Sequence, residues 1–381
     1  SLKSVQDIFV FIAEIPHNIK NPAYYEIVNR PNNLLRHQIK PKYKRFKNDK
    51  IEALIVLPRY VGHLNRAIVE VRDLQNFELL HTYSHDINKM WSQVDDSRPE
   101  HKRLNIDHQE IRFEYRHPII LNDGSLIASS EYSPLFKLDL CSNLLWINDE
   151  ERFHHSKMID HNGNIWVSAQ LFPYSQLVSK YMKQYGFRDD SISLISPQGK
   201  ILFNKSVSSI LVENGIVSED SLFLNNDPVH LNDIEPILED GKFWRKGDLF
   251  LSLRSLNMII LYRPSNNKVI EMIKGPFYMQ HDVDILDNER IIFFNNNNSV
   301  LNDKKTSQIM IYDFESKNFT KLIQDSLNKD KVKTTTQGLI EVLKDGSIIV
   351  EENNDARLIH YNTNGQKIWE YVNKDDNNEI Y

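Results

Sequence analysis

A hairpin-like unit that recurs along the chain constrains its fold more than any other feature. Each copy has an apolar run, a turn rich in Asn, Asp or Gly, and a second apolar run, and the copies occupy residues 116–127, 154–167, 280–293 and 337–350. The turn residues tolerate the positive φ values that short β-hairpins need. A further pair of apolar runs follows each hairpin, so a repeat holds about four strands in roughly 50 residues, which is typical of a β-propeller.

We therefore predict an all-β fold, with a six-bladed β-propeller over residues 49–381, which has room for about six such repeats. A helical or irregular extension is expected over residues 1–48. The basic stretch 36–45 suits a solvated linker, with contact to a membrane surface as the alternative. An amphipathic helix that ends near Pro16 would serve as a membrane-proximal stalk or as a homodimer contact, and its apolar residues recur at helical spacing at Val5, Ile8, Phe9, Phe11, Ile12 and Ile15.

Composition limits the classes of function. The 381 residues are 40% hydrophobic and 26% charged, which is a globular composition. The net charge of -6 gives no support to nucleic-acid binding. Cys141 is the single cysteine, so an internal disulfide and a multi-cysteine zinc site are both excluded. No apolar run reaches the roughly 18 residues of a transmembrane helix.

The residues that begin the inner strands of a propeller meet at one mouth of its central channel. In the repeat register, His155 and His281 hold this axial position, and His230 opens a further blade in the same way. Arg254 follows on an otherwise apolar strand. Histidine supplies a nucleophilic nitrogen near neutral pH, and arginine suits planar oxyanions. We therefore predict a site for the transfer of a sulfuryl or phosphoryl group, which depends on positioning and charge stabilisation.

Structural roles are the alternatives for these residues. A hairpin histidine can be satisfied by a backbone carbonyl, and Arg254 could form an internal ion pair with Asp282 or Asp284. Whether His154 or His155 faces the channel stays open, because adjacent strand residues point to opposite faces. No His-x-His or His-Glu-x-x-His spacing supports a catalytic metal, so no metal site is predicted.

The motifs carry a resemblance to a known family. The chain resembles the arylsulfate sulfotransferases, six-bladed propellers that move sulfuryl groups without a nucleotide donor. The resemblance spans roughly residues 112–371, and the segments that carry it are Asp227–Asp233, Ser252–Arg254, Gln280–Asp282, the His154-His155 pair and Trp369–Tyr371.

The resemblance implies roles for individual residues. His281 would be the nucleophile that becomes transiently sulfated. His230, Asn232 and Arg254 would bind the sulfuryl oxygens and stabilise the transition state. His281 must then be neutral at the attacking nitrogen, and Arg254 would help by disfavouring a second positive charge nearby.

The His154-His155 pair would complete the site from the opposite side. His155 would bind the sulfuryl group or assist proton transfer to the phenolic oxygen, and His154 competes with it for that role. The pair is followed by Ser156 and Lys157, where the family pattern leads us to expect an acidic residue. This departure bears on acceptor specificity more than on sulfuryl transfer.

The resulting expectation is an aryl-sulfate sulfotransferase with a phenolic acceptor and a sulfohistidine intermediate. No cofactor is expected, although a propeller channel leaves room for structural calcium. The alternatives are a non-catalytic propeller that binds a partner and a hydrolase that uses water as acceptor. Because relatives are exported and the first residue is Ser1, we expect a processed periplasmic or exported protein, with a membrane anchor upstream of Ser1 as a variant of this expectation.

Overall fold

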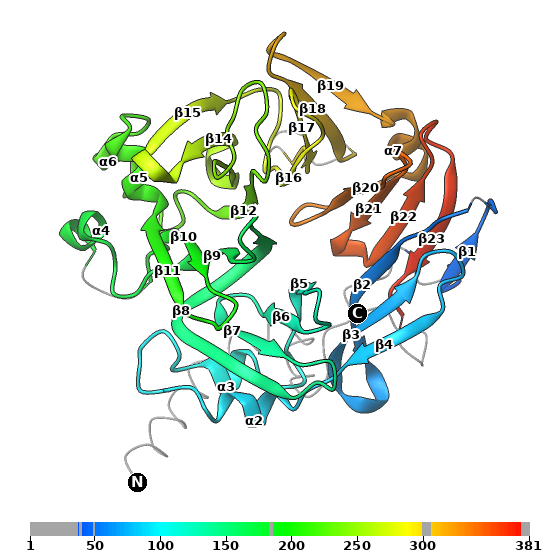
Figure 1. Cartoon of the computed structure of the whole chain (residues 1–381), viewed down its shortest axis with the longest axis horizontal. Coiled ribbons are helices and arrows are strands. Elements are labelled where there is room, and N and C mark those ends of the chain that lie inside the picture. Colours follow the sequence, from blue (N-terminus) through cyan, green and yellow to red (C-terminus); the bar gives the residue numbers. More distant parts are fainter. Residues whose placement is uncertain (1–36, 38–39, 49, 183–185, 299–305, 375–381) are drawn as a thin grey trace, which may run out of the picture.

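The computed structural model describes residues 37, 40–48, 50–182, 186–298 and 306–374. The described chain is all-β apart from short helices, and its strands form small antiparallel sheets that follow one another around a common centre (Figure 1). No helix among these residues has the length and apolar character to span a membrane. The helix predicted before Pro16 lies outside the described residues.

Hydrogen bonding groups the strands into five sheets. The three-stranded sheet has β2 (Leu54–Val61), β3 (Arg66–Asp73) and β4 (Leu79–Tyr83). The seven-stranded sheet has β5 (Arg116–Ile120), β6 (Leu126–Ser129), β7 (Ser133–Leu138), β8 (Leu144–Ile159), β9 (Ile165–Gln170), β10 (Asp190–Ile195) and β11 (Ile201–Ser206). One four-stranded sheet has β12 (Leu231–Pro236), β13 (Leu249–Leu253), β14 (Met258–Arg263) and β15 (Lys268–Ile273).

The remaining two sheets complete the ring. The second four-stranded sheet has β16 (His281–Ile285), β17 (Arg290–Asn295), β18 (Gln308–Asp313) and β19 (Asn318–Leu322). The five-stranded sheet has β20 (Ile340–Val342), β21 (Ile348–Glu352), β22 (Arg357–Tyr361), β23 (Lys367–Val372) and β1 (Tyr43–Arg45). Figure 1 shows β2, β5, β12, β16 and β20 nearest the centre.

The prediction of six blades is wrong. Four of the sheets have four or more strands, and the fifth has three. The cause is β8, a strand of 16 residues. Its first part pairs with β7 and its last part pairs with β9, so the hairpins at 116–127 and 154–167 belong to one seven-stranded sheet. The fold is therefore a propeller-like ring of small sheets rather than six separate blades.

The first described strand belongs to the last sheet. β1 lies within the predicted extension 1–48 and pairs with β23, with Tyr43 opposite Tyr371 and Arg45 opposite Trp369. Glu370 on β23 forms an ion pair with Lys40 at 2.8 Å. Hydrogen bonds and charge therefore join the two ends of the described chain and close the ring.

Apolar side chains fill the spaces between neighbouring sheets. On β13, Leu251 packs with Ile192 of the preceding sheet, whereas Phe250 packs with Phe293 of the following sheet. Successive strand residues point to opposite faces, so both faces of this sheet are buried. Each such side chain contributes roughly 1.5–3 kcal/mol, and burial of both faces explains why these strands are apolar throughout in the sequence.

Short helices lie at the periphery of the ring (Figure 1). They connect strands within or between sheets, at α2 (Ile87–Trp91), α3 (Leu104–Asp107), α4 (Gln176–Tyr181), α5 (Val207–Glu213), α6 (Glu219–Leu222) and α7 (Gln324–Asp330). Side chains form N-caps at α2, α4 and α5, where Asp86, Ser175 and Ser206 accept from backbone N–H groups of the first turn.

Side chains on the inner strands link each sheet to the next. On β8, β12 and β16, a polar side chain accepts a hydrogen bond from a backbone N–H of the following inner strand. The pairs are Ile234 N–H to Ser156 Oγ at 3.2 Å, Val283 N–H to Asp233 Oδ2 at 2.7 Å, and Ile340 N–H to Asp282 Oδ2 at 2.5 Å. These bonds satisfy backbone donors that have no ladder partner between separate sheets.

Candidate functional site

The structure brings the three predicted histidines together near the centre of the ring. The ring centroid of His155 lies 5.2 Å from that of His230 and 6.5 Å from that of His281. His155 belongs to β8, His230 directly precedes β12, and His281 is the first residue of β16. Each imidazole therefore comes from a different inner strand, as the repeat register predicts.

Irregular backbone turns these side chains toward one another. The pairing register shifts in β5 between Arg116 and Ile119, in β8 between His154 and Lys157, in β12 between Leu231 and Asp233, and in β16 between His281 and Val283. A bulge at the same place in each inner strand reorients the local side chain. His117, His155 and His230 have φ values of 39°, 53° and 51°, a strained conformation that suits a functional position.

Hydrogen bonds fix the tautomer of His281. Its Nδ1 lies 3.0 Å from Met279 O and 2.7 Å from Asn296 Oδ1. The Asn296 amide is oriented because its Nδ2 donates to Thr334 O and Gln337 O. Both neighbours of Nδ1 are thus acceptors, so Nδ1 carries the proton. Nε2 keeps its lone pair and accepts a hydrogen bond of 3.2 Å from Gln337 N–H.

His281 is neutral at physiological pH. Its pKa is lowered to about 3, mainly by burial. The bond to Asn296 opposes this shift, whereas the nearby Arg254 and His230 add to it. A neutral imidazole with its lone pair on Nε2 is the form that can attack an electrophile, and the attack displaces the hydrogen bond from Gln337 N–H.

A carboxylate orients His230. Its Nδ1 lies 2.6 Å from Asp227 Oδ2, and the guanidinium of Arg188 donates to the same oxygen at 2.7 Å. Burial opposes the charge on Asp227, but the bonds from His230 and Arg188 hold the pKa of this carboxyl below its usual value. Nδ1 of His230 therefore donates to a carboxylate, and its Nε2 is left for the centre of the site.

The structure places both histidines of the 154–155 pair in the cluster. Their Nδ1 atoms lie 2.7 Å apart, because the left-handed conformation of His155 breaks the usual alternation of strand residues. His155 contacts the other two imidazoles, whereas His154 packs behind it against the ring of Tyr132. Burial lowers the pKa of both histidines well below the usual value.

Three polar atoms of the predicted site lack a hydrogen-bond partner among the described residues. They are Nε2 of His154, Nε of Arg254 and Oδ1 of Asn232, whose Nδ2 donates to Gln280 O at 2.7 Å. Arg254 opens the 3₁₀ turn η3 (Arg254–Leu256) directly after β13, and does not lie within a strand as expected. It is half-buried and forms no ion pair with Asp282 or Asp284, so the predicted structural alternative is not formed. Unsatisfied groups of this kind suit a bound ligand.

A donor set that could hold a metal ion also lies at this cluster. The set consists of one ligand atom from each of Glu131, His154 and His155, and these atoms all lie within 4.8 Å of one another. His155 Nδ1 is 3.5 Å from Glu131 Oε1. A hydrogen bond between the two Nδ1 atoms accounts for the same arrangement without a metal.

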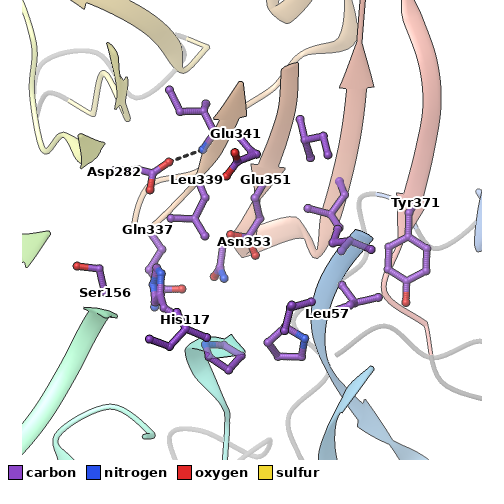
Figure 2. Close-up of a pocket in the computed structure, with 18 of the residues that line it drawn as sticks. Leu57, His117, Ser156, Asp282, Gln337, Leu339, Glu341, Glu351, Asn353 and Tyr371 are labelled. Carbon is purple, nitrogen blue, oxygen red and sulfur yellow. Dashed lines mark hydrogen bonds between the residues drawn. The ribbon is translucent and has the colours of Figure 1, made fainter. Parts of the chain in front are cut away.

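A cavity of about 1320 Å³ adjoins the histidine cluster. Figure 2 shows part of its lining, with His117, Ser156 and Gln337 at one side and Leu57 and Tyr371 at the other. Carboxyl side chains also face it, among them Asp282, Glu341 and Glu351. The predicted site residues are not part of this lining, but Gln337 is, and its backbone N–H contacts His281 Nε2. The cavity therefore reaches the atom next to the candidate nucleophile.

Comparison with known proteins decides the family. The model of the arylsulfotransferase (ASST) family matches residues 117–374, well over half of the chain. The chain belongs to the arylsulfotransferase family. The match contains all six predicted site residues, which are His154, His155, His230, Asn232, Arg254 and His281.

Other comparisons add little to the arylsulfotransferase assignment. No curated protein matches the chain. A protein of unknown function from Bacteroides caccae is 12% identical, with a TM-score of 0.49 over 83% of this chain and 92% of that one. Virginiamycin B lyase from Staphylococcus aureus is 12% identical, with a TM-score of 0.39 over 67% of this chain and 69% of that one. Scores this low support no inference about this chain.

Sequence reasoning missed several residues of the candidate site. His117 stands in the same register as His155 and His281, and this signal was sufficient to find it. The pKa of His117 is lowered to about 3, mainly by burial and then by Lys157, Arg116 and His281. His117 therefore lies near these three residues. No sequence signal identified Asn296, Gln337 or Arg188, because each acts through a contact between distant segments.

Proposed function

We propose that this member of the arylsulfotransferase family transfers a sulfuryl group from an aryl sulfate to a phenol by double displacement, through a sulfohistidine at His281. The observation that carries the proposal is the state of His281. Its Nδ1 proton is held by two acceptors, and its pKa of about 3 keeps it neutral. Its Nε2 therefore carries the lone pair, which accepts from Gln337 N–H at 3.2 Å until a substrate displaces that bond.

In the first half-reaction, His281 Nε2 attacks the sulfur of the aryl sulfate. The S–N bond forms as the bond from sulfur to the phenolic oxygen breaks, and that oxygen takes the electron pair. Negative charge on the sulfuryl oxygens and the leaving oxygen must be stabilised in the transition state. The unpaired Nε of Arg254 and the second N–H of Asn232 are suited to this role.

The other histidines hold the sulfuryl group from further directions. His230 is oriented by Asp227, and His155 lies between His230 and His281. We assign both of them to contacts with the sulfuryl oxygens, with His154 behind them. No nucleotide enters this proposal, because the aryl ester itself supplies the sulfuryl group, and a phenol then removes it from Nε2.

The test uses 4-nitrophenyl sulfate as donor and phenol as acceptor. The native protein should release 4-nitrophenol in a burst and gain the mass of one sulfuryl group on His281. His281→Ala should lose the burst and reduce turnover by about 10³-fold or more, because the nucleophile is gone. His161→Ala is the matched control, since His161 is exposed at the turn after β8.

Three outcomes would contradict the proposal. Full transfer by His281→Ala would exclude the sulfohistidine. Release of inorganic sulfate at the same rate with and without phenol would indicate a hydrolase. A protein that binds the aryl sulfate and never turns it over would be a binding module.

A further inference from the structure

Lys157 is a buried lysine that the site as described so far does not use. It lies on β8, two residues after His155, with 1% of its surface exposed. Its Nζ donates to Arg116 O at 2.9 Å and to His155 O at 3.1 Å. Within the described residues, no carboxylate forms an ion pair with it. A lysine without a counter-ion in such a place is costly to keep charged.

The two hydrogen bonds match the neutral amine. An uncharged NH₂ group has two N–H bonds and one lone pair, whereas an ammonium has three N–H bonds. Both carbonyls are accounted for by the two N–H bonds of the neutral form, and the lone pair is then free. Burial is the largest cause that lowers the pKa of Lys157 to about 7, opposed by the charge of Glu131 and aided by that of Arg116.

Lys157 lies beside a space that a substrate can fill. It lines the cavity of about 1320 Å³ together with His117, Ser156 and Gln337. Gln337 also contacts His281 Nε2 through its backbone N–H. Figure 2 shows His117, Ser156 and Gln337 at the same side of the cavity. An aryl group in this cavity would lie beside Lys157 and beside Gln337, the residue that contacts the nucleophile.

The charged and titratable groups around Lys157 come from three elements. Arg116 and His117 face it from β5, Glu131 faces it from the turn before β7, and His155 precedes it on β8. The pKa values of His117 and His155 are lowered far enough that both are neutral near pH 7. Arg116 keeps its charge, and the pKa of Glu131 is raised by burial. Lys157, with a pKa of about 7, therefore titrates near neutral pH beside two neutral imidazoles.

We propose that Lys157 is the general base that takes the proton from the acceptor phenol, a role that rests on the proposed function. The phenol O–H proton moves to Lys157 Nζ, which becomes an ammonium. The phenolic oxygen attacks the sulfur on His281, the S–N bond breaks, and its electron pair returns to Nε2. The products are an aryl sulfate, neutral His281 and protonated Lys157.

The same group closes the cycle. Donor and acceptor are both phenol derivatives, so the first half-reaction is the chemical reverse of the second with a different aryl group. Protonated Lys157 returns its proton to the next leaving phenolate, and no net proton is gained or lost over one cycle. A leaving group that is stable as a phenolate, such as 4-nitrophenolate, does not need this proton.

The experiment separates the two half-reactions. Native protein, Lys157→Met and Lys157→Arg are first sulfated with 4-nitrophenyl sulfate, and the burst is measured. The sulfated proteins are then treated at pH 8 with phenol, which holds its proton, or with pentafluorophenol, which is already ionised. Lys157→Met should slow transfer to phenol by about 10²–10⁴-fold, the usual contribution of a general base. Transfer to pentafluorophenolate should change by no more than a few-fold.

Further measurements guard against a merely structural effect. Lys157→Arg keeps N–H donors but has no available lone pair, so it should fold and show the same selective loss. Transfer to phenol by the native protein should rise with pH through about 7, and the variants should lack this rise. Lys137→Met is the matched control, because Lys137 is buried on β7 beside Asp123 and does not line the cavity.

The outcomes are distinguishable. An equal loss with both acceptors, or an unchanged pH dependence in Lys157→Met, would overturn the base role and leave the sulfohistidine in place. Absence of any burst in the native protein would overturn the proposed function and the base role with it.

Discussion

The charge on Arg254 disfavours protonation of His281. In the proposed reaction it would also stabilise the negative charge that develops on the sulfuryl group. Its Nε is left without a partner among the described residues, which is costly unless a ligand supplies one. The same guanidinium therefore suits both the binding of an anion and the neutrality of the nucleophile.

Replacement of this charge gives a test at the scale of one residue. Arg254→Gln should slow the 4-nitrophenol burst by about 10²–10³-fold, the usual cost of removing a preorganised oxyanion contact. The pKa of His281 should rise above about 3, because a repelling positive charge is lost. Single-turnover kinetics and NMR titration of the imidazole measure the two effects. Arg245→Gln, at an exposed position, serves as control, and an unchanged burst would show that Arg254 has no such role.

Lys157 also predicts a pH dependence of stability. Its folded pKa of about 7 lies below the ordinary value of 10.5. Between these two values the unfolded chain binds the proton and the folded chain does not, so stability should rise with pH across this window. The rise from this group amounts to at most about 1.4 kcal/mol per pH unit. Urea unfolding at pH 7 and pH 9 gives the free energy of unfolding of the native protein and of Lys157→Met. This free energy should rise with pH more in the native protein than in the variant, and an equal rise in both would contradict the lowered pKa.

Single residues of the site were partly predictable. His155, His230 and His281 follow from the register of the repeat, and the same register holds His117. The roles of Lys157 and Asn296 do not follow, because Lys157 bonds to a carbonyl 41 positions away and Asn296 to one 38 positions away. Contacts of this kind depend on which strands become neighbours in space.

At the scale of elements, the inner strands are joined by side chains rather than by a continuous ladder. Asp233 of β12 and Asp282 of β16 each accept from the backbone of the next inner strand. Asp233 is buried and Asp282 is half-buried, and desolvation raises the pKa of each. The bulges that turn the histidines inward leave backbone N–H groups without ladder partners, and these side chains satisfy them.

Removal of one such link should destabilise the ring. Asp233→Ala leaves the N–H of Val283 buried without an acceptor, and we expect a loss of about 1–3 kcal/mol in the free energy of unfolding. Asp233→Asn keeps an acceptor oxygen and should lose less. Chemical denaturation of both variants, with Asp220→Ala at an exposed position as control, provides the measurement. Equal losses for Ala and Asn would mean that the hydrogen bond is not the cause.

The hairpins themselves were predictable, and their grouping into sheets was not. The four sequence hairpins correspond to β5–β6, β8–β9, β16–β17 and β20–β21. Turn residues and apolar runs mark these units locally. The sequence pattern does not show that β8 is one long strand that pairs first with β7 and then with β9. One long strand and two separate strands have the same alternation of side chains along the sequence.

At the scale of the whole molecule, charge reinforces the closure of the ring. Glu370 on β23 bonds Lys40 and Lys367 at 2.8 Å each. Although burial opposes its charge, these bonds lower the pKa of Glu370 to about 2. β1 and β23 are thus joined by a strand ladder and by an ion-pair cluster beside it.

This cluster predicts a loss of stability in acid. The folded pKa of Glu370 lies below its usual value of 4.5, so its contribution is present above pH 4.5 and is lost as pH falls toward about 2. The contribution is about 1–3 kcal/mol. Glu370→Gln should therefore lower stability at pH 6 and lessen its fall between pH 5 and pH 3. Thermal melts across this range measure the effect, and identical pH profiles would rule it out.

The long strand β8, which pairs with both β7 and β9, also limits where the ring of sheets can open. Across β8 the hydrogen-bond ladder is continuous from β5 to β11, so an opening motion there must break several backbone bonds together. Opening between separate sheets breaks only side-chain links and apolar contacts. The cavity is lined by residues of both β2 and the β20–β22 strands, which belong to separate sheets. The cavity thus lies at a junction that can widen while the backbone hydrogen bonds within each sheet stay intact.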